Sequence, residues 1–120
     1  MPPRNWETLV DDMLQSIDRI EEYTRGLEFE EFAGDSMRVD AVLLNLTIIG
    51  EAASRVPVDV QQRLPSVPWK EMRGMRNVIV HSYYGVRLPV VWETVRENLP
   101  HLVRPLRAAL SGAPDDPAAS

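Results

Sequence analysis

The chain has 120 residues, enough for one domain that buries a core without disulfides or metal ions. It contains no cysteine, which excludes a disulfide framework and a thiolate metal site. The net charge of −5 argues against a protein that coats nucleic acid by bulk electrostatics, yet residues 63–107 carry 8 basic and only 3 acidic side chains. This basic region could bind a polyanion, or its arginines have merely accumulated on the surface.

No part of the sequence has the pattern of an export signal or a membrane span. The N-terminus lacks an apolar run followed by a small-residue cleavage site, and the longest apolar stretch, 41–50, is interrupted by Asn45 and Thr47. We therefore expect a cytoplasmic protein that does not contact a membrane.

The first predicted element is an amphipathic helix that begins after Asn5, a suitable N-cap, and ends before Gly26. A short helical turn could follow it and pack Phe29 and Phe32. Spacings of three and four, typical of an amphipathic helix, separate the apolar residues Trp6, Leu9, Val10, Met13, Ile17 and Ile20.

A second long helix is predicted to begin at a cap, Asp35 or Ser36, and to run to about Arg55, where Pro57 ends it. Apolar side chains surround much of this helix, so we expect it to lie centrally, where it could also contact a partner chain. Residues 56–68 contain three prolines and predict a connector with at most one helical turn.

A third long helix is predicted from about Trp69 to about Tyr84. A fourth begins near Leu88, and Pro100 and Pro105 should bend it or split it.

These elements predict an all-α fold with four main helices in an up-down bundle. We expect one domain over residues 1–110. Residues 111–120 have too little apolar surface to pack and are expected to form a flexible tail.

The third predicted helix carries a polar face opposite an apolar one. At about 100° per residue, Arg73, Arg76, Asn77 and His81 lie away from the apolar arc, with Val80 among them. The residues of that arc are predicted to face the core: Met72, Met75, Val78, Ile79 and Val86.

The composition of this polar face is unlike that of an ordinary solvated helix. Lysine, glutamate, glutamine and aspartate are absent from residues 73–84, where arginine, asparagine, histidine and tyrosine stand instead. These are groups that bind phosphate and move protons. The pattern favours a functional site over a structural dimer interface or a plain wet face, and Val80 suggests that a second subunit covers it.

The spacing of Arg76, His81 and Tyr83, with Asn77 directly after the arginine, resembles the R-x-x-x-x-H-x-Y signature of the HepT-like toxins, which are ribonucleases of the HEPN superfamily. Two flanking segments strengthen the resemblance. LNLTIIGEAASRVP resembles the family's Gly-Glu-Ala helix, and LPVVWETVRENLPHL resembles its tryptophan-containing last helix.

The resemblance implies a homodimer in which Arg76 and His81 of both subunits line a cleft, and metal-independent cleavage of RNA without a cofactor. It also implies a type VII toxin–antitoxin system, in which a minimal nucleotidyltransferase antitoxin transfers AMP onto Tyr83. The competing hypothesis is a non-catalytic helical dimer that binds a nucleotide or docks such a nucleotidyltransferase.

The residue types suit this reaction. RNA cleavage without a metal requires proton removal from the 2′-hydroxyl, attack on the adjacent phosphorus and protonation of the departing 5′-oxygen. His81 is predicted as the general base or acid, because imidazole does both at neutral pH, and Arg76 as the cation that stabilises phosphate charge. Asn77 could orient phosphate or histidine, and Arg73 could help bind the RNA backbone.

The helix geometry of the motif and the roles of the remaining side chains complete the predictions. Arg76 and His81 lie about 140° apart on a helix, too far to act as a pair on one face, which is a second reason to expect a dimer. A tyrosine at position 83 could also simply pack its ring, but the resemblance favours AMP acceptance. His101 is expected to be structural, and Glu51 has no chemical assignment.

Overall fold

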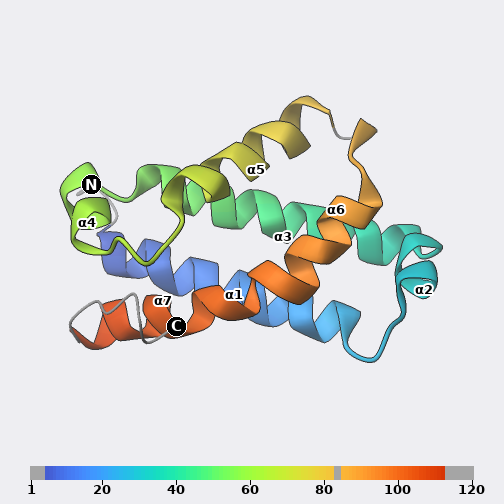
Figure 1. The fold of residues 1–120 in the computed structure, drawn as a ribbon, viewed down its shortest axis with the longest axis horizontal. Coiled ribbons are helices and arrows are strands. Elements are labelled where there is room, and N and C mark those ends of the chain that lie inside the picture. The colour runs from blue at the N-terminus through green and yellow to red at the C-terminus, as the bar shows by residue number, and fades with distance from the viewer. Residues whose placement is uncertain (1–4, 83–84, 113–120) are drawn as a thin grey trace.

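The computed structural model describes residues 5–82 and 85–112 (Figure 1). All regular structure in these residues is helical, which confirms the all-α class, and no helix among them is both long and apolar enough to cross a membrane. In chain order the elements are α1 (Trp6–Thr24), α2 (Phe29–Ala33), α3 (Ser36–Arg55), α4 (Val58–Arg63), α5 (Trp69–His81), α6 (Leu88–Glu93), a π-helical segment η2 (Thr94–Asn98) and α7 (Pro100–Ser111).

Three long helices form the body of the fold, with α3 at its centre. Figure 1 shows α1 and α3 side by side in opposite directions, α5 against α3, and the α6–α7 arm crossing the bundle until α7 reaches α1. The largest fully buried side chains come from α1, α2, α3 and α7 and include Met13, Ile20, Phe32, Leu46, Ile49 and Leu106. Burying each such side chain stabilises the fold by roughly 1.5–3 kcal/mol. Because these side chains come from several helices, α3 is packed on several sides.

The helix starts agree with the sequence prediction. The Asn5 side chain accepts a hydrogen bond of 3.0 Å from the backbone N–H of Thr8, and Asp35 accepts one of 3.2 Å from that of Arg38. Each bond satisfies one of the four N–H groups that a helix start leaves without an intrahelical partner. α1 ends at Thr24, two residues before Gly26.

The predicted fourth helix is split, as expected from its prolines. The backbone N–H of Leu99 bonds to the carbonyl of Thr94 at 2.9 Å, five residues back, just before Pro100. Proline has no N–H to donate and crowds the preceding turn, so the chain widens into η2 and resumes as α7. The four-helix count is therefore not confirmed: three long helices are joined by this segmented arm and by the short α2 and α4. α7 also includes Ser111, one residue beyond the predicted domain end, and Gly112 (φ 75°) caps it.

Arg96 fastens the segmented arm to the α1–α2 connection. Its Nη2 donates to the carbonyls of Thr24 at 3.0 Å and Leu27 at 2.7 Å, and its guanidinium lies 4.4 Å from the ring centroid of Trp92. The other side of the tryptophan packs near Phe32, with ring centroids 4.9 Å apart. These contacts bind the arm to carbonyls at and just after the end of α1, and Arg96 is a second donor to the carbonyl of Thr24, which also accepts from the N–H of Leu27.

Two boundaries differ from the prediction. The connector expected to hold at most one helical turn contains α4, whose six residues form because Val60 is buried and Gln61 bonds to the end of α3. The third helix was expected to reach Tyr84, but α5 ends at His81, because Ser82 departs from helical geometry (φ −137°, ψ 38°). Tyr84 itself lies outside the described residues.

The predicted core face of the third helix is wrong at one position. Met72 and Ile79 are buried and Met75 and Val86 partly buried, whereas Val78 is 58% exposed. Val78 borders an open groove between α5 and α6 instead of a closed core. Burial of that position would need a neighbour that the single chain does not supply.

Gly50 allows α3 and α5 to approach closely. A Cβ placed on Gly50 would lie 2.3 Å from the Cβ of Arg76 and 2.8 Å from the carbonyl oxygen of Met72. Both distances are shorter than a Cβ atom tolerates, and the carbonyl oxygen of Met72 belongs to the rigid backbone. Only glycine fits at this crossing.

Gly50→Ala should therefore destabilise the protein by about 1–3 kcal/mol, because the added methyl pushes α5 away from α3. The matched control is Gly74→Ala on α5, where an added Cβ meets nothing within 4 Å. That change should stabilise by about 0.5–1 kcal/mol, since alanine favours a helix interior. Urea unfolding followed by circular dichroism measures both, and equal stabilities of the two variants would contradict the close-packing argument.

Candidate functional site

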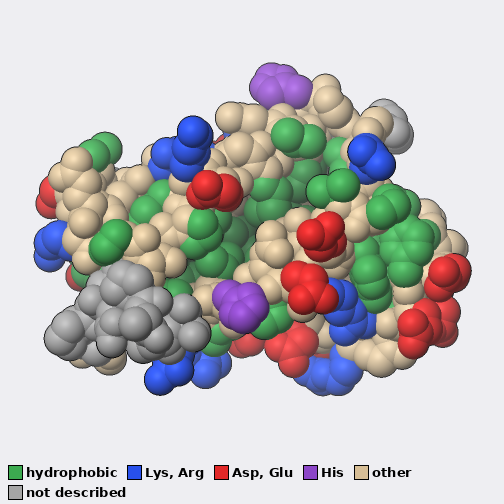
Figure 2. Space-filling model, in the orientation of Figure 1, with side chains coloured by type: hydrophobic (Ala, Val, Ile, Leu, Met, Phe, Trp, Pro, Cys, Tyr) green, Lys and Arg blue, Asp and Glu red, His purple; other side chains and the backbone are tan. Residues whose placement is uncertain are grey.

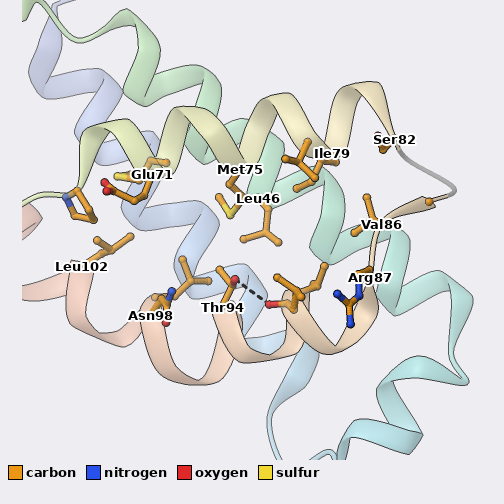
Figure 3. Close-up of a pocket in the computed structure, with 17 residues that line it drawn as sticks. Leu46, Glu71, Met75, Ile79, Ser82, Val86, Arg87, Thr94, Asn98 and Leu102 are labelled. Carbon is orange, nitrogen blue, oxygen red and sulfur yellow. Dashed lines mark hydrogen bonds between the residues drawn. The ribbon is translucent and has the colours of Figure 1, made fainter.

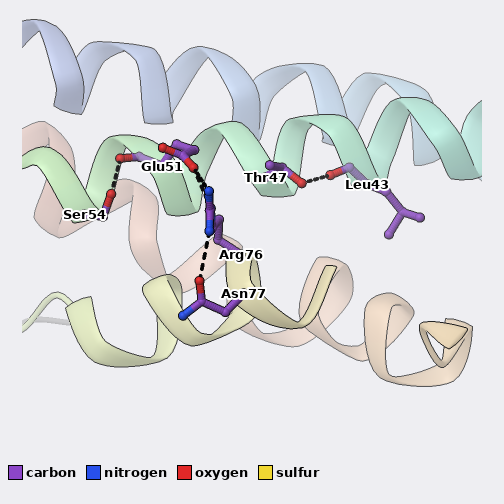
Figure 4. Close-up of polar contacts among 6 residues, drawn as sticks. All are labelled: Leu43, Thr47, Glu51, Ser54, Arg76 and Asn77. Atoms are coloured by element: carbon purple, nitrogen blue, oxygen red, sulfur yellow. Dashed lines mark hydrogen bonds and ion pairs between the residues drawn. The ribbon is translucent and has the colours of Figure 1, made fainter. Parts of the chain in front are cut away.

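Arg76 leaves α5 at the crossing with α3 and meets Glu51, the residue after Gly50 (Figure 4). Its Nε and Nη2 both bind the same carboxylate oxygen, Oε1 of Glu51. The two side chains are 32% and 36% exposed, so water still reaches the ion pair. At such exposure an ion pair contributes at most about 1 kcal/mol to stability, and its main effect is to fix the orientation of the guanidinium.

The neighbouring Asn77 is exposed and takes a third donor of this guanidinium. Nη1 of Arg76 donates to its Oδ1 at 3.1 Å. A guanidinium has five N–H donors, so one on Nη1 and one on Nη2 have no partner among the described residues. Guanidinium N–H groups of this kind can donate to phosphate oxygens. Asn77 thus orients the arginine, a contact that the sequence did not predict.

Arg73 lies one turn earlier on α5 and is engaged in a structural contact. Its Nη1 donates to Oε1 of Gln61 at 2.9 Å, and Nε2 of Gln61 donates to the carbonyls of Ala53 at 3.3 Å and Val56 at 2.9 Å. This chain of bonds ties α5 to α4 and to the end of α3. The predicted role of Arg73 in binding the RNA backbone would use the N–H donors of its guanidinium that Gln61 does not occupy.

His81 is the last residue of α5 and is exposed. In the described chain no hydrogen bond or ion pair joins its imidazole to Arg76, and five residues of helix separate the two by roughly 7–8 Å along the axis. The structure therefore does not bring the two predicted catalytic residues into contact within one chain. Tyr83, the predicted AMP acceptor, lies outside the described residues.

A second feature borders α5 on the side away from Glu51. An apolar groove of about 560 Å³ runs between α5 and the α6–α7 arm, with Leu46 of α3 at its base, and Figure 3 shows Met75, Ile79 and Val86 turned into it. Figure 2 shows hydrophobic side chains gathered in this hollow. Most of its lining is apolar, and Glu71, Ser82 and Arg87 are among its polar members.

The other candidate groups are placed apart from this site. His101 is exposed at the start of α7, on a different helix from His81. Within residues 5–82 and 85–112, no three His, Asp or Glu side chains gather as a possible metal site. The arrangement around Arg76 can bind and orient an anion through a fixed cation, with an exposed imidazole at the end of the same helix.

The residue that the sequence left without a role is Glu51. Its contact with Arg76 spans 25 positions, which no local pattern reveals. One signal was nevertheless present, since Glu51 is the only carboxylate in the apolar stretch from residue 41 to residue 56 and it follows a glycine that helix propensity disfavours. A glycine and a carboxylate adjacent inside an apolar helix indicate a close helix crossing next to a buried or half-buried cation.

Comparison with known proteins identifies the family of the chain. The family model "Ribonuclease HepT-like" matches residues 13–109. A protein of Thermococcus cleftensis named "Probable ribonuclease HepT" is 40% identical over 82% of this chain and 90% of its own. One from Methanocaldococcus jannaschii named "Putative RNase MJ1216" is 36% identical over 85% of this chain and 84% of its own.

A third relative, "Putative RNase TTE0752" of Caldanaerobacter subterraneus subsp. tengcongensis, is 34% identical over 84% of this chain and 90% of its own. No solved structure matches the chain at comparable significance. The family model and these relatives each span most of the chain, including α3 and α5, so the site lies inside the matched region. The chain belongs to the HepT-like ribonuclease family.

Proposed function

We propose that the protein is the toxin of a type VII toxin–antitoxin pair and cleaves RNA without a metal ion, at a site formed by Arg76 and His81 of two copies. The observation that carries this proposal is the fixed guanidinium of Arg76. Glu51 and Asn77 hold it while two of its N–H donors have no partner in the described chain. A cation held in this way can bind a phosphate without a further loss of side-chain conformational entropy.

The exposed apolar side chains around the site support a dimer. Leu44 of α3 is 60% exposed, and Val80 of α5 is 46% exposed on the same side of the helix as Arg76. A contiguous exposed apolar patch with a polar rim marks a surface that a partner covers, and Leu44 and Val80 would belong to such a patch. A second copy would also bring its own His81 and Arg76 to this surface, which repairs the separation within one chain.

The proposed reaction needs only these groups. One His81 takes the proton of a 2′-hydroxyl, whose oxygen forms a bond to the adjacent phosphorus. The bond from phosphorus to the 5′-oxygen breaks, and the imidazolium of the other His81 gives that oxygen a proton. Arg76 binds the non-bridging phosphate oxygens, where negative charge increases in the transition state.

Silencing by AMP transfer is the proposed regulation. A nucleotidyltransferase antitoxin would transfer AMP from ATP to the hydroxyl of Tyr83, two positions after His81 in the sequence, so that the tyrosine oxygen bonds to the α-phosphorus and pyrophosphate leaves. The added phosphate is negative and would compete with RNA for Arg76. The adenosine would add bulk next to the imidazole.

His81→Ala and Arg76→Ala should each lower RNA cleavage by at least about 10²-fold, since each removes a group that acts on the reacting atoms. Cleavage is measured in a chelator-containing buffer, and gel filtration with circular dichroism confirms that the variants remain folded and assembled as the parent. His101→Ala is the matched control, because this exposed histidine lies on α7, and it should cleave like the parent. Parental cleavage by His81→Ala would refute the mechanism.

Tyr83→Phe should abolish mass additions in AMP units when the chain is co-expressed with the neighbouring nucleotidyltransferase. Intact-mass spectrometry measures the additions, and Tyr84→Phe, which changes the adjacent ring in the same way, should still carry them. Additions that persist in Tyr83→Phe would move the acceptor to another residue.

A non-catalytic helical dimer that docks the nucleotidyltransferase or binds a nucleotide is the second candidate. The acidic net charge of −5 and the apolar groove beside α5 favour it. Expression of the chain without its partner distinguishes the two, because a ribonuclease toxin should arrest growth and a docking module should not. His81→Ala should restore growth if RNA cleavage causes the arrest.

A further inference from the structure

Glu51 lies on α3 and holds Arg76 of α5, the cation that is proposed above to bind the phosphate. Its Oε1 occupies Nε and Nη2 on one edge of the Arg76 guanidinium, and Asn77 occupies Nη1. Figure 4 shows Glu51 and Arg76 reaching toward each other from α3 and α5. The N–H groups that have no partner in the described chain belong to Nη1 and Nη2, whereas Glu51 occupies the edge formed by Nε and Nη2.

We propose that Glu51 is a positioning residue for RNA cleavage, which turns the Nη1–Nη2 edge of Arg76 toward the scissile phosphate. The inference rests on the proposed function of Arg76 as the cation that binds this phosphate. Glu51 touches no reacting atom and acts only through Arg76. The substrate group that this arrangement recognises is a phosphodiester with two oxygens presented to one guanidinium edge.

The packing at the helix crossing explains why one carboxylate can fix this orientation. Gly50 lets the Cβ of Arg76 come against the backbone of α3, so the arginine side chain starts from a fixed point. Glu51 follows directly on the same helix and holds the far end of that side chain. Both ends of the Arg76 side chain are therefore positioned by contacts with α3, although the residue belongs to α5.

A carboxylate beside the proposed phosphate position could also hinder RNA binding. Glu51 is negative, 36% exposed and close to the proposed phosphate position, so it could repel RNA or compete with the phosphate for Arg76. If competition dominated, removing the charge would strengthen RNA binding and speed cleavage. If positioning dominates, removing it slows cleavage while RNA binding stays the same or becomes tighter.

Full-length Glu51→Gln and Glu51→Ala test this difference. A fluorescent mixed-sequence RNA oligonucleotide gives the single-turnover cleavage rate, and its 2′-O-methyl version, which lacks the attacking hydroxyl, gives the dissociation constant. Glu51→Ala should slow cleavage by about 10- to 100-fold, as a misplaced catalytic group does, without weakening binding. Glu51→Gln retains an oxygen that accepts from Arg76 and should retain more activity than Glu51→Ala.

Two controls separate the possible failures. Glu71→Gln removes one negative charge from α5 without touching Arg76, and it should cleave at the parental rate, so any general effect of charge on RNA binding appears there. Cleavage by Glu51→Ala at the parental rate or faster overturns the positioning role, and so does a slower rate matched by an equal loss of binding. If Arg76→Ala cleaves like the parent, the proposed function itself fails; if Arg76→Ala is inactive and Glu51→Ala is not slowed, only the positioning inference fails.

Discussion

The close crossing of α3 and α5 at Gly50 is the constraint on which the rest of the structure depends. α5 carries the Arg76 motif, and it can lie against α3 only where a side chain is missing. The contact that packs the bundle is therefore also the contact that positions the site. Two neighbouring residues form this crossing, a glycine that brings the helices together and a glutamate that binds the arginine.

The distribution of charge fits a protein that must bind RNA without coating it. Acidic side chains predominate in residues 1–62, whereas bases predominate in residues 63–107, where α5 and the α6–α7 arm lie. The acidic part repels polyanions in general, and the basic part attracts them locally. Binding should then depend on the few arginines near α5 and weaken strongly as salt screens them.

Local rules were enough to predict most of the fold. The caps at Asn5 and Asp35, the apolar spacing of the first helix and the split at Pro100 depend on residues within a few positions of one another. The errors concern neighbours that are distant in sequence: α4 is stabilised by Gln61 reaching α3, and Val78 is exposed at the open groove between α5 and α6. Likewise, the motif predicts a site at Arg76 and His81, whereas Glu51, which binds Arg76, is 25 positions away in the sequence and adjacent only through the contact of α3 with α5.

The π-helical segment before Pro100 has a consequence for how the last arm can vary. Val91, Val95 and Leu99 are all buried although they are four residues apart, a spacing that would rotate the third by about 80° from the first in an α-helix. The wider turn of η2 absorbs this drift, so the two halves of the arm share one core face. Losing a single residue here would let the segment close into a regular α-helix, and Leu102 and Leu106 would keep their orientation relative to Val91, because η2 takes up one extra residue. The arm can therefore lose one residue at η2 and keep its apolar face on the core, whereas the same loss within α7 would rotate the residues that follow by about 100°.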